Sequence, residues 1–475
     1  MAIEVPSKTF TREEVAKHNT EDSVWFVIDS VVYDVSDFVD AHPGGEAVLR
    51  QVAGTDATSD FYNLHRHEVL VKYADLAIGT LAGEKPSVIT PKPGDLSLVP
   101  YAEPLWLTPS FRSPYYKDSH RRLQRAIREF TELYITPEAQ EKERDGTHIS
   151  QGLIDRMSKA GILHMRLGPG KHLQGVELLG GAVEPKEFDY FHDLIMAQEM
   201  VRANARGFQD GSLAGMVIGL TAVLNFANDE KFKKKISDEV FSGKKKICLA
   251  ITEAFAGSDV ARLRTTAVKT PDGKHYIVNG TKKWITNGTT YITFDNVKVP
   301  VENLLGKENQ GIYVILSNFN HERWTMACAT IRYSRTVVEE CLKWAHQRLV
   351  FGKRLIDQPV IRLKLAKMIA LVEANQSWLE TITYQMCNMP YSEQAKFLGG
   401  PIGLLKMSCT RAAHDIADES VQIFGGRALT QTGMGRVVEN FQRTYKFDAI
   451  LGGAEEVLGD LGVRQAMKFM PKAML

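Results

Sequence analysis

The spacing of hydrophobic residues divides the chain into regions of different secondary structure. Near the start, Thr11 with Glu14 three positions later predicts a capped helix. The run VWFVIDSVVYDVSDFV then holds two short apolar segments around an Asp-Ser pair, which predicts two strands joined by a turn. From Tyr116 to about residue 240, apolar residues recur every three or four positions, as in HRRLQRAIREFTELY, and this predicts amphipathic helices.

The second half of the chain repeats this change of pattern. Residues 246–300 alternate like strands, with turns at Pro271-Asp272-Gly273 and Asn287-Gly288, and long helical periodicity resumes beyond Gly311. Residues 84–114 contain seven prolines and little periodicity, so we expect a semi-extended linker there. We therefore expect five parts: a small domain over 1–83, the linker, a helical domain over 115–245, a β-domain over 246–305 and a helical bundle over 306–475.

Composition excludes several classes of protein. The 58 basic and 57 acidic residues nearly cancel, which argues against a nucleic-acid or lipid-surface partner. Five cysteines without paired spacing do not form a disulfide framework or a metal motif. The apolar stretch Leu213–Ala227 is too short for a membrane span and predicts a buried helix. With no targeting segment evident, we expect a soluble protein of the cytoplasm or of an organelle lumen, peroxisome and mitochondrion included.

The first domain carries two histidines in a suggestive setting. His42 begins HPGG, where proline and glycines allow close backbone approach, and His65 lies 23 positions later in FYNLHRH. Two neutral imidazoles held apart could ligate a haem iron from both faces. Two ordinary surface histidines are the alternative that spacing alone leaves open.

Residues 6–82 resemble the cytochrome b5 family through YDVSDFVDAHPGGEAVL and AGTDAT, in that order. The resemblance implies a small α+β domain holding haem b, with His42 as first axial ligand. Most members place the second ligand at the position of Arg66 in this chain, one residue after His65. The Phe-x-x-Leu-His spacing is instead similar to the haem domain of lactate-oxidising flavocytochromes, which implies His65, with His67 as the alternative.

Two segments of the β-domain combine small residues and hydroxyls. ITEAFAGSDV (251–260) and GTKKWITNG (280–288) would suit a flat aromatic cofactor lying against backbone edges, although an ordinary hairpin fits the composition too. Both segments resemble the flavin-facing strands of the acyl-CoA dehydrogenase family, and the order helices, strands, helices from about 115 to 475 is similar as well. The resemblance implies a helical N-terminal domain, a middle β-domain and a C-terminal four-helix bundle.

The same resemblance implies the cofactor and substrate contacts. FAD would be held by residues of the β-domain and of the helical bundle. Some of these residues would reach the nucleotide half of the FAD in a neighbouring subunit, so a homodimer or homotetramer is expected. The implied FAD contacts are Thr252, Ser258, Trp284, Ile285, Thr286, Arg348, Phe351, Gln358, Gln422, Gly425, Gly426, Gly453 and Glu456. Ser258, Asn320 and Arg323 would line the acyl-CoA channel.

The catalytic base is the sharpest inference from the resemblance. Most of the family carries a glutamate in a C-terminal motif, and counting from Arg443 places Gly452 at that position. A minority, including isovaleryl- and long-chain-type enzymes, keeps a small residue there and carries the glutamate on an earlier helix. The run NFNHERW puts Glu322 at this second place, so we expect Glu322 to be the base. By itself, Glu322 beside Arg323 would be an ordinary pair on a solvated helix face.

The pattern of the family breaks after Thr290. Several tens of residues that normally follow GTKKWITNG are absent, and YITFDNVKVP comes at once. We expect a β-domain truncated after about 290, with exposed edges and apolar surface.

These inferences lead to a hypothesis of function. We expect flavin-dependent oxidation of an acyl-CoA to the 2,3-enoyl-CoA, with the fused six-coordinate haem, or a further electron-transfer partner, taking electrons singly. One alternative is an oxidase or nitroalkane-oxidising flavoprotein of the same fold that uses oxygen. Another is a truncated form that binds only haem and is not catalytic.

Overall fold

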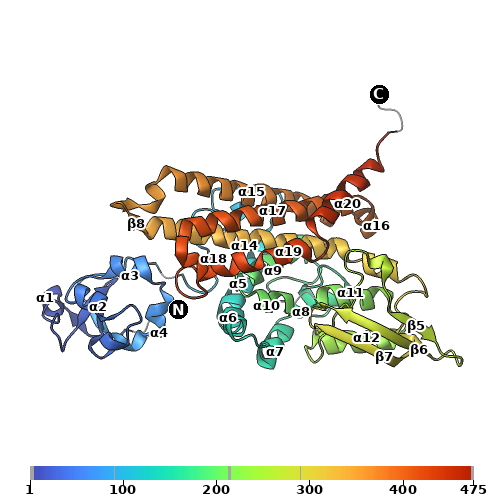
Figure 1. Cartoon of the computed structure of the whole chain (residues 1–475), viewed down its shortest axis with the longest axis horizontal. Helices are drawn as coiled ribbons and strands as arrows, with labels where there is room; N and C mark the ends of the chain where they lie inside the picture. The colour runs from blue at the N-terminus through green and yellow to red at the C-terminus, as the bar shows by residue number, and fades with distance from the viewer. Residues whose placement is uncertain (1–4, 90, 212–214, 289, 472–475) are drawn as a thin grey trace. The chain divides into compact units, whose positions relative to one another are not determined.

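The computed structural model describes residues 5–89, 91–211, 215–288 and 290–471. Its chain forms two compact units, each built from several segments. Figure 1 labels the helices and strands by the names used below. The first unit consists of Met1–Val99, Glu340–Leu365 and Ser420–Asn440, and the second of Pro100–Glu339, Ala366–Glu419 and Phe441–Leu475.

The N-terminal domain is a four-stranded sheet with short helices. Strand order is β1-β4-β3-β2; β1 pairs with β4 in parallel and the other pairs are antiparallel. The elements are β1 (Thr9–Phe10), α1 (Arg12–Val15), β2 (Trp25–Ile28), β3 (Val31–Asp34), α2 (Glu46–Val52), α3 (Thr58–Leu64), α4 (Glu68–Lys72) and β4 (Ala77–Leu81), with 3-10 turns at Ser36–Ala41 and Ala74–Leu76.

Local sequence accounts for the expected features of this domain. The Thr11 hydroxyl accepts from the Glu14 amide and the Glu14 carboxylate accepts from the Thr11 amide, which completes the capping box. Asp29 and Ser30, at φ 49° and 69°, form the tight turn between β2 and β3. The strand alternation buries Val27 and Val32 on one face of the sheet and Phe26 and Tyr33 on the other.

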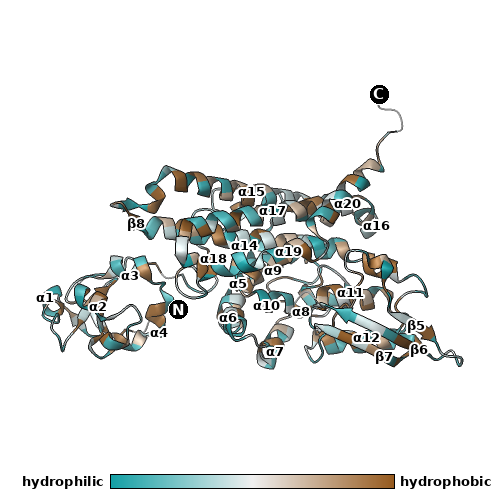
Figure 2. Cartoon of the chain, viewed as in Figure 1, coloured by the Kyte–Doolittle hydropathy of each residue, from teal (hydrophilic) through white to brown (hydrophobic). Residues whose placement is uncertain are grey.

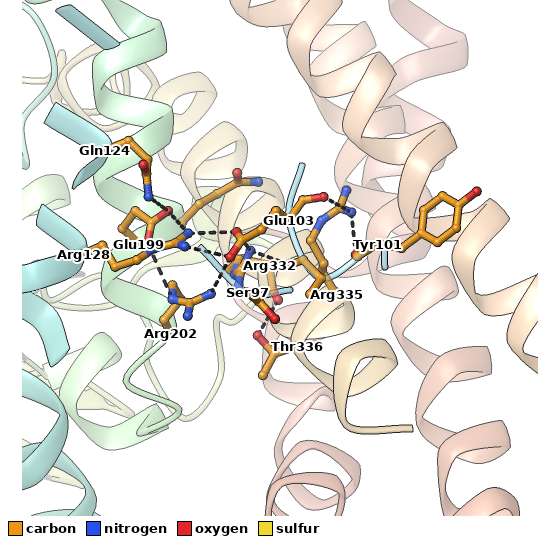
Figure 3. A network of polar contacts seen from close by, with 12 residues as sticks. Ser97, Tyr101, Glu103, Gln124, Arg128, Glu199, Arg202, Arg332, Arg335 and Thr336 are labelled. Atoms are coloured by element: carbon orange, nitrogen blue, oxygen red, sulfur yellow. Dashed lines mark hydrogen bonds and ion pairs between the residues drawn. The ribbon is translucent and has the colours of Figure 1, made fainter. Parts of the chain in front are cut away.

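The segment 84–114 differs from the extended linker that its prolines predict. Leu105–Leu107 form a 3-10 turn, and Ala102, Glu103 and Trp106 are buried. The Glu103 carboxylate accepts two hydrogen bonds from Arg128, at 2.7 and 2.8 Å, and lies 3.4 Å from Arg332 (Figure 3). Arg128 also binds Glu199, so this part of the segment is locked into a buried ionic network instead of running free.

The helical domain that follows packs α5 against α9. Gln124 and Arg128 of α5 both bond to Glu199 of α9, and the Asp189 carboxylate caps α9. Most of the apolar stretch predicted to be a buried helix forms α11; residues 213 and 214 lie outside the described part. The helices are α5 (Asp118–Phe130), α6 (Thr136–Asp145), α7 (Gln151–Lys159), α8 (Ile162–Met165), α9 (Tyr190–Val201), α10 (Arg206–Gln209), α11 (Gly215–Phe226) and α12 (Glu230–Phe241), with a π-helical turn at Thr131–Ile135 between α5 and α6.

The middle domain is a small antiparallel sheet of β5 (Thr266–Lys269), β6 (His275–Lys283) and β7 (Tyr291–Pro300), in that order. Lys283 pairs with Tyr291, and the Trp284 amide donates to the Thr290 carbonyl, so β6 and β7 pair up to the point where the resemblance predicts further residues. The sheet leaves large apolar side chains exposed, among them Val268, Trp284 and Tyr291, as expected for a domain that lacks part of its cover.

The remaining helices form a bundle whose members alternate hydrophobic and hydrophilic residues (Figure 2). Trp324 of α14 donates to Thr383 of α15, and α20 packs closely on α17 where Gly462 faces Leu404. The elements are α13 (Gly311–Leu316), α14 (Phe319–Gln347), β8 (Leu349–Val350), β9 (Lys353–Arg354), α15 (Pro359–Asn388), α16 (Tyr391–Phe397), α17 (Gly399–Phe424), α18 (Arg436–Thr444), α19 (Lys446–Ile450) and α20 (Glu455–Met467). Among the described helices, none combines the length and apolar character needed to cross a membrane.

Candidate functional site

Glu322 lies in the first turn of α14 and faces the loop between α19 and α20. Gly452 in that loop has φ 67°, and a Cβ added to it would lie 3.6 Å from Oε1 of Glu322. The two positions at which the resemblance allows the catalytic glutamate, 322 and 452, therefore lie side by side. The loop is fixed there because Arg323 donates to the Gly452 carbonyl at 3.0 Å and Lys406 to the Gly453 carbonyl at 2.7 Å.

The electrostatics of this point suit a proton acceptor. Burial raises the pKa of the Glu322 carboxyl to about 7, and the nearby charge of Arg323 opposes the shift only in part. Burial also lowers the pKa of Lys406 to about 8. A carboxylate poised near neutral pH can take a proton and release it again.

An apolar cavity of about 230 Å³ ends at Glu322. Side chains of α11 and α13 form much of its wall, together with Leu249, Leu305 and Phe319. Such a lining offers shape and hydrophobic contact but little hydrogen bonding.

The two residues beside Glu322 that are expected to line the acyl-CoA channel, Asn320 and Arg323, do not line the apolar cavity. Asn320 faces Gly399 at the start of α17 and is absent from the lining of the cavity. Arg323 is engaged with the Gly452 carbonyl and packs over the Phe319 ring at 5.2 Å. We interpret Arg323 as a positioning residue for the loop.

The segment expected to cradle the flavin is organised by Glu253, which the sequence did not single out. Its buried carboxylate accepts from the Arg264 amide at 2.6 Å and from Lys282 Nζ at 2.8 Å. These and further bonds from Thr265 outweigh the opposing effect of burial and lower the pKa of Glu253 to about 2. Glu253 thus ties the loop after residue 251 to β6.

The flavin-facing positions lie along this tied edge. Thr252 accepts from the Lys283 amide at 2.8 Å, and Ile285 is buried beneath the turn. Thr286 is half-buried, Ser258 is exposed, and Trp284 is 68% exposed with φ 59°. An added Cβ at Gly257 would meet nothing within 4 Å, so a planar ring could approach the backbone there.

The positions expected to reach the nucleotide half of FAD lie at the ends of α14 and α17. Phe351, at the tip of the β8–β9 hairpin, is 96% exposed, and Gln358 begins the approach to α15. Gln422, Gly425 and Gly426 are exposed, and nothing lies within 4 Å of a Cβ built on either glycine.

Arg427 is a second residue that the sequence missed. The guanidinium groups of Arg348 and Arg427 both lie over the buried Trp344 ring, 5.9 and 5.0 Å from its centre. Neither has an acidic side chain within ion-pairing distance among the described residues. The Gly-Gly-Arg order (425–427) was the available signal, because glycines beside an arginine suit a phosphate.

Two further expected contacts flank the start of α20. Gly453 has φ 110°, and its carbonyl accepts from Lys406. Glu456 is exposed in the first turn of α20, where the helix dipole favours an acidic group.

His42 and His65 face each other in the N-terminal domain, with ring centres 6.0 Å apart. The Nδ1 atom of His42 hydrogen-bonds the Gly45 carbonyl at 3.0 Å, and that of His65 the Phe61 carbonyl at 3.3 Å. Both Nε2 atoms are thereby left as free ligands. A Cβ at Gly44 would lie only 2.6 Å from the His42 ring, so glycine is required there.

His67 is differently placed. Its Nδ1 hydrogen-bonds the Tyr62 hydroxyl at 3.2 Å, and among the described residues it has no ring contact with His42. Arg66, which replaces the more usual residue, bonds to the buried Glu340 at 2.5 Å and to the Met434 carbonyl at 2.9 Å. Arg66 lowers the pKa of Glu340 to about 2 against the effect of burial.

One further cluster has metal-like composition. His120, Asp189 and His192 bring ligand atoms within 4.8 Å of one another. Their atoms are already engaged, since His120 accepts from the Lys117 amide and contacts Asp189, while His192 contacts Asp189 and Ser119. We interpret the cluster as a capping network at the starts of α5 and α9.

Comparison with known proteins agrees with this geometry. Residues 117–244, 248–315 and 309–467 match the N-terminal, middle and C-terminal domains of acyl-CoA dehydrogenases. Acyl-CoA dehydrogenase apdG of Emericella nidulans is 36% identical over 427 residues, covering 79% of this chain and 96% of that protein. The chain belongs to the acyl-CoA dehydrogenase family. Acyl-CoA dehydrogenase AFT10-1 of Alternaria alternata is similar too, at 34% over 425 residues, 78% of this chain and 96% of that protein.

This acyl-CoA dehydrogenase carries an added domain, because residues 11–82 match the cytochrome b5-like heme/steroid binding domain. The fusion inferred from the sequence is confirmed. The alignment with apdG spans 427 positions, whereas 79% of the 475 residues of this chain is only about 375 residues. The alignment therefore contains gaps in this chain, and apdG has residues there without a counterpart.

Solved structures show the same fold. A putative acyl-CoA dehydrogenase from Mycobacterium smegmatis aligns with a TM-score of 0.64 at 22% identity, covering 76% of this chain and all of that one. Acyl-CoA dehydrogenase complexed with FAD from Bacillus anthracis aligns with a TM-score of 0.62 at 22% identity, covering 75% of this chain and 68% of that one.

Family membership identifies the cofactors of this flavoenzyme as FAD and haem. The residues present fit both groups. The opposed free Nε2 atoms of His42 and His65 suit a haem iron. The open glycine edges and the arginines without acidic partners suit a dinucleotide.

Proposed function

We propose that this chain oxidises an acyl-CoA thioester to the 2,3-enoyl-CoA, with Glu322 as the base. The observation that carries the proposal is the convergence of Glu322 and Gly452 on one point at the end of an apolar cavity. A buried carboxylate with a pKa near 7, a cavity for an acyl chain and a family that binds FAD together support this chemistry.

In the proposed reaction, Glu322 takes a proton from the α-carbon while the electron pair of that bond forms the new double bond. FAD, when bound, supplies the acceptor for the hydride that leaves the β-carbon. Arg323 and Lys406 hold the loop that faces Glu322, and apolar side chains line the cavity beside the carboxylate. Release of the proton afterwards returns Glu322 to its charged state.

We further propose that the haem domain receives the electrons one at a time. A haem with histidine on both faces has no open position for oxygen, which suits electron transfer. The ligand loop that contains His65 also contains Arg66, and Arg66 bonds to Glu340 of α14. Glu68 forms a second ion pair with Arg436, at 3.1 Å. These contacts support a docking surface between the haem domain and the C-terminal segments of its own unit.

An anaerobic mixing experiment tests this function. Acyl-CoA added to the FAD- and haem-loaded protein should bleach the flavin band first and then reduce the haem, both followed by absorbance. Flavin bleaching with a haem that stays ferric over many turnovers would refute the electron transfer alone. A flavin band unchanged by any acyl-CoA tested would refute the dehydrogenase proposal.

Changing Arg66 to alanine should slow haem reduction and leave flavin bleaching unchanged. Removing one partner of a buried ion pair costs about 2–5 kcal/mol of docking free energy, so we expect roughly tenfold slower reduction or more. Arg12→Ala is the matched control, because Arg12 pairs with Asp56 and Glu84 on the exposed surface of the same domain. Equal rates for both variants, with intact haem spectra, would contradict the docking role.

One observation favours a second function. Phe255, Trp284 and Tyr291 of the shortened middle domain are 70%, 68% and 59% exposed, as in a domain that has lost its cover. A form that binds haem alone and serves as a carrier would have this surface. The absorbance spectrum of the purified protein separates the two: flavin shoulders beside the haem band support the enzyme, and a haem band alone supports the carrier.

A further inference from the structure

A second cavity, smaller and more polar, also ends at Glu322. It has a volume of about 50 Å³ and lies among α8, α10, α11, α14 and α19. Glu322 and Ile218 line both this polar chamber and the apolar cavity. The volume is several times the roughly 10–15 Å³ that one water needs, so the polar chamber can accept a group of a few heavy atoms.

Arg166 is the unusual member of the polar chamber. Its side chain is 5% exposed, and its Nε–H has no hydrogen-bond acceptor among the described residues. The carboxylate of Asp193 is near enough to act on it electrostatically, but that group is already bound to His321 at 2.7 Å. A buried guanidinium without a hydrogen-bond partner is costly and indicates that something else completes the site.

Apart from Glu322, the other charged groups of the polar chamber are paired. Arg206 binds Asp448 through two hydrogen bonds, at 3.0 and 2.5 Å, and Asp210 at 2.7 Å. Gln209 adds a buried amide oxygen without a donor among the described residues. Of the two arginines in the polar chamber, Arg166 is therefore the one available to bind a ligand.

The pairing of charges in the polar chamber leaves Arg166 to bind an anion. Burial raises the pKa of Asp210 to about 7 despite the opposing charge of Arg206, so this carboxyl is often neutral. The charges of Arg206 and Asp448 cancel in their ion pair. The positive charge of Arg166 is therefore offset by no ion pair or hydrogen bond in the described part of the chain.

We propose that the acyl group oxidised here ends in a carboxylate, and that Arg166 binds this carboxylate in the polar chamber. This inference rests on the proposed dehydrogenase function, because it assigns the substrate class of the same site. A carboxylate matches the planar fork of a guanidinium, which can donate to both of its oxygens. Ordered water filling the polar chamber is the competing explanation, and it predicts no preference for a charged acyl group.

The test compares acyl-CoA pairs of equal chain length, one ending in methyl and one in carboxylate, on the FAD-loaded full-length protein. We expect kcat/KM for flavin reduction to favour the carboxylate roughly ten- to hundredfold, as for a hydrogen bond to a buried charge. Arg166→Met should abolish that preference with little loss on the methyl-ended acyl-CoA. Arg166→Lys keeps the charge and should restore part of the preference.

A binding measurement separates this inference from the catalytic proposal. Calorimetry with Glu322→Gln, which cannot turn over, should show the same preference for the carboxylate even if no acyl-CoA reduces the flavin. Equal binding of both ligands, stronger binding of the methyl-ended ligand, or a preference that survives Arg166→Met would each overturn the assignment. A ligand ending in hydroxyl that binds better than the carboxylate would overturn it as well.

Discussion

Glu322→Gln is expected to slow flavin reduction by acyl-CoA by roughly 10²–10⁴-fold, the usual contribution of a positioned general base. The amide keeps the shape of the side chain but cannot take the α-proton. Binding of acyl-CoA should change little, because the walls of the apolar cavity are untouched. Rapid-mixing absorbance of the flavin band measures the rate, and titration of the oxidised protein measures the binding.

The same residue sets the expected pH dependence. Because burial raises the pKa of Glu322 to about 7, the carboxyl is protonated and inactive as a base at lower pH. The rate constant for flavin reduction should therefore rise with pH through about 7 and then level off. Glu322→Asp should retain a rising profile, whereas the residual rate of Glu322→Gln should lack this step.

Two companion variants make the assignment of the base specific. Glu455→Gln removes another buried carboxyl, which pairs with Arg411 at 3.4 Å, and should leave the reaction rate nearly unchanged. Glu322→Gly combined with Gly452→Glu moves the carboxylate to the alternative position. A Cβ added at Gly452 would lie 2.8 Å from the flexible Met326 side chain, and the left-handed backbone at Gly452 disfavours a residue with a side chain. We therefore expect the reaction rate to recover only in part. A Glu322→Gln enzyme as fast as the parent would exclude Glu322 as the base.

Changing His65 to alanine is expected to have the largest effect on the haem domain. Loss of an axial ligand should weaken haem binding by at least roughly 10–100-fold and remove the six-coordinate spectrum. His67→Ala should keep both, because His67 is engaged with the Tyr62 hydroxyl and does not face His42. The absorbance of ferric and ferrous protein during haem titration measures the difference.

The control for this experiment is the external ligand. Imidazole added to His65→Ala can occupy the vacated position and should restore the low-spin spectrum, which a merely unfolded domain would not show. If His67→Ala loses the six-coordinate spectrum and His65→Ala keeps it, the assignment of the second ligand is reversed.

Much of the fold follows from local patterns. The Thr11–Glu14 capping box and the Asp29-Ser30 turn are set by neighbouring residues, so the sequence predicted them directly. The change from helical to strand-like periodicity at the middle domain was visible for the same reason. The proximity of Gly452 to Glu322 was inferred from resemblance alone, since 130 positions separate the two residues.

What could not be predicted depends on contacts between distant residues. Glu253 and Lys282 are 29 positions apart, and neither has a distinctive local sequence. Glu103 lies among prolines that indicate a linker, yet its partners Arg128 and Arg332 are 25 and 229 positions away. Arg166 stands out only because it is buried without a hydrogen-bond acceptor, and burial of a single arginine has no sequence signature.

The ionic network around Glu103 has a consequence for how the haem domain finds its docking surface. Ser87 and Val88 are bound to Asp29 of the haem domain, and Glu103 is fixed to Arg128, so the covalent tether between them is short. At about 3.5 Å per residue, the stretch between Val88 and Glu103 spans about 50 Å at most. A tether of this length gives an effective concentration on the order of millimolar. The tether therefore keeps Arg66 within reach of Glu340 at any dilution of the protein.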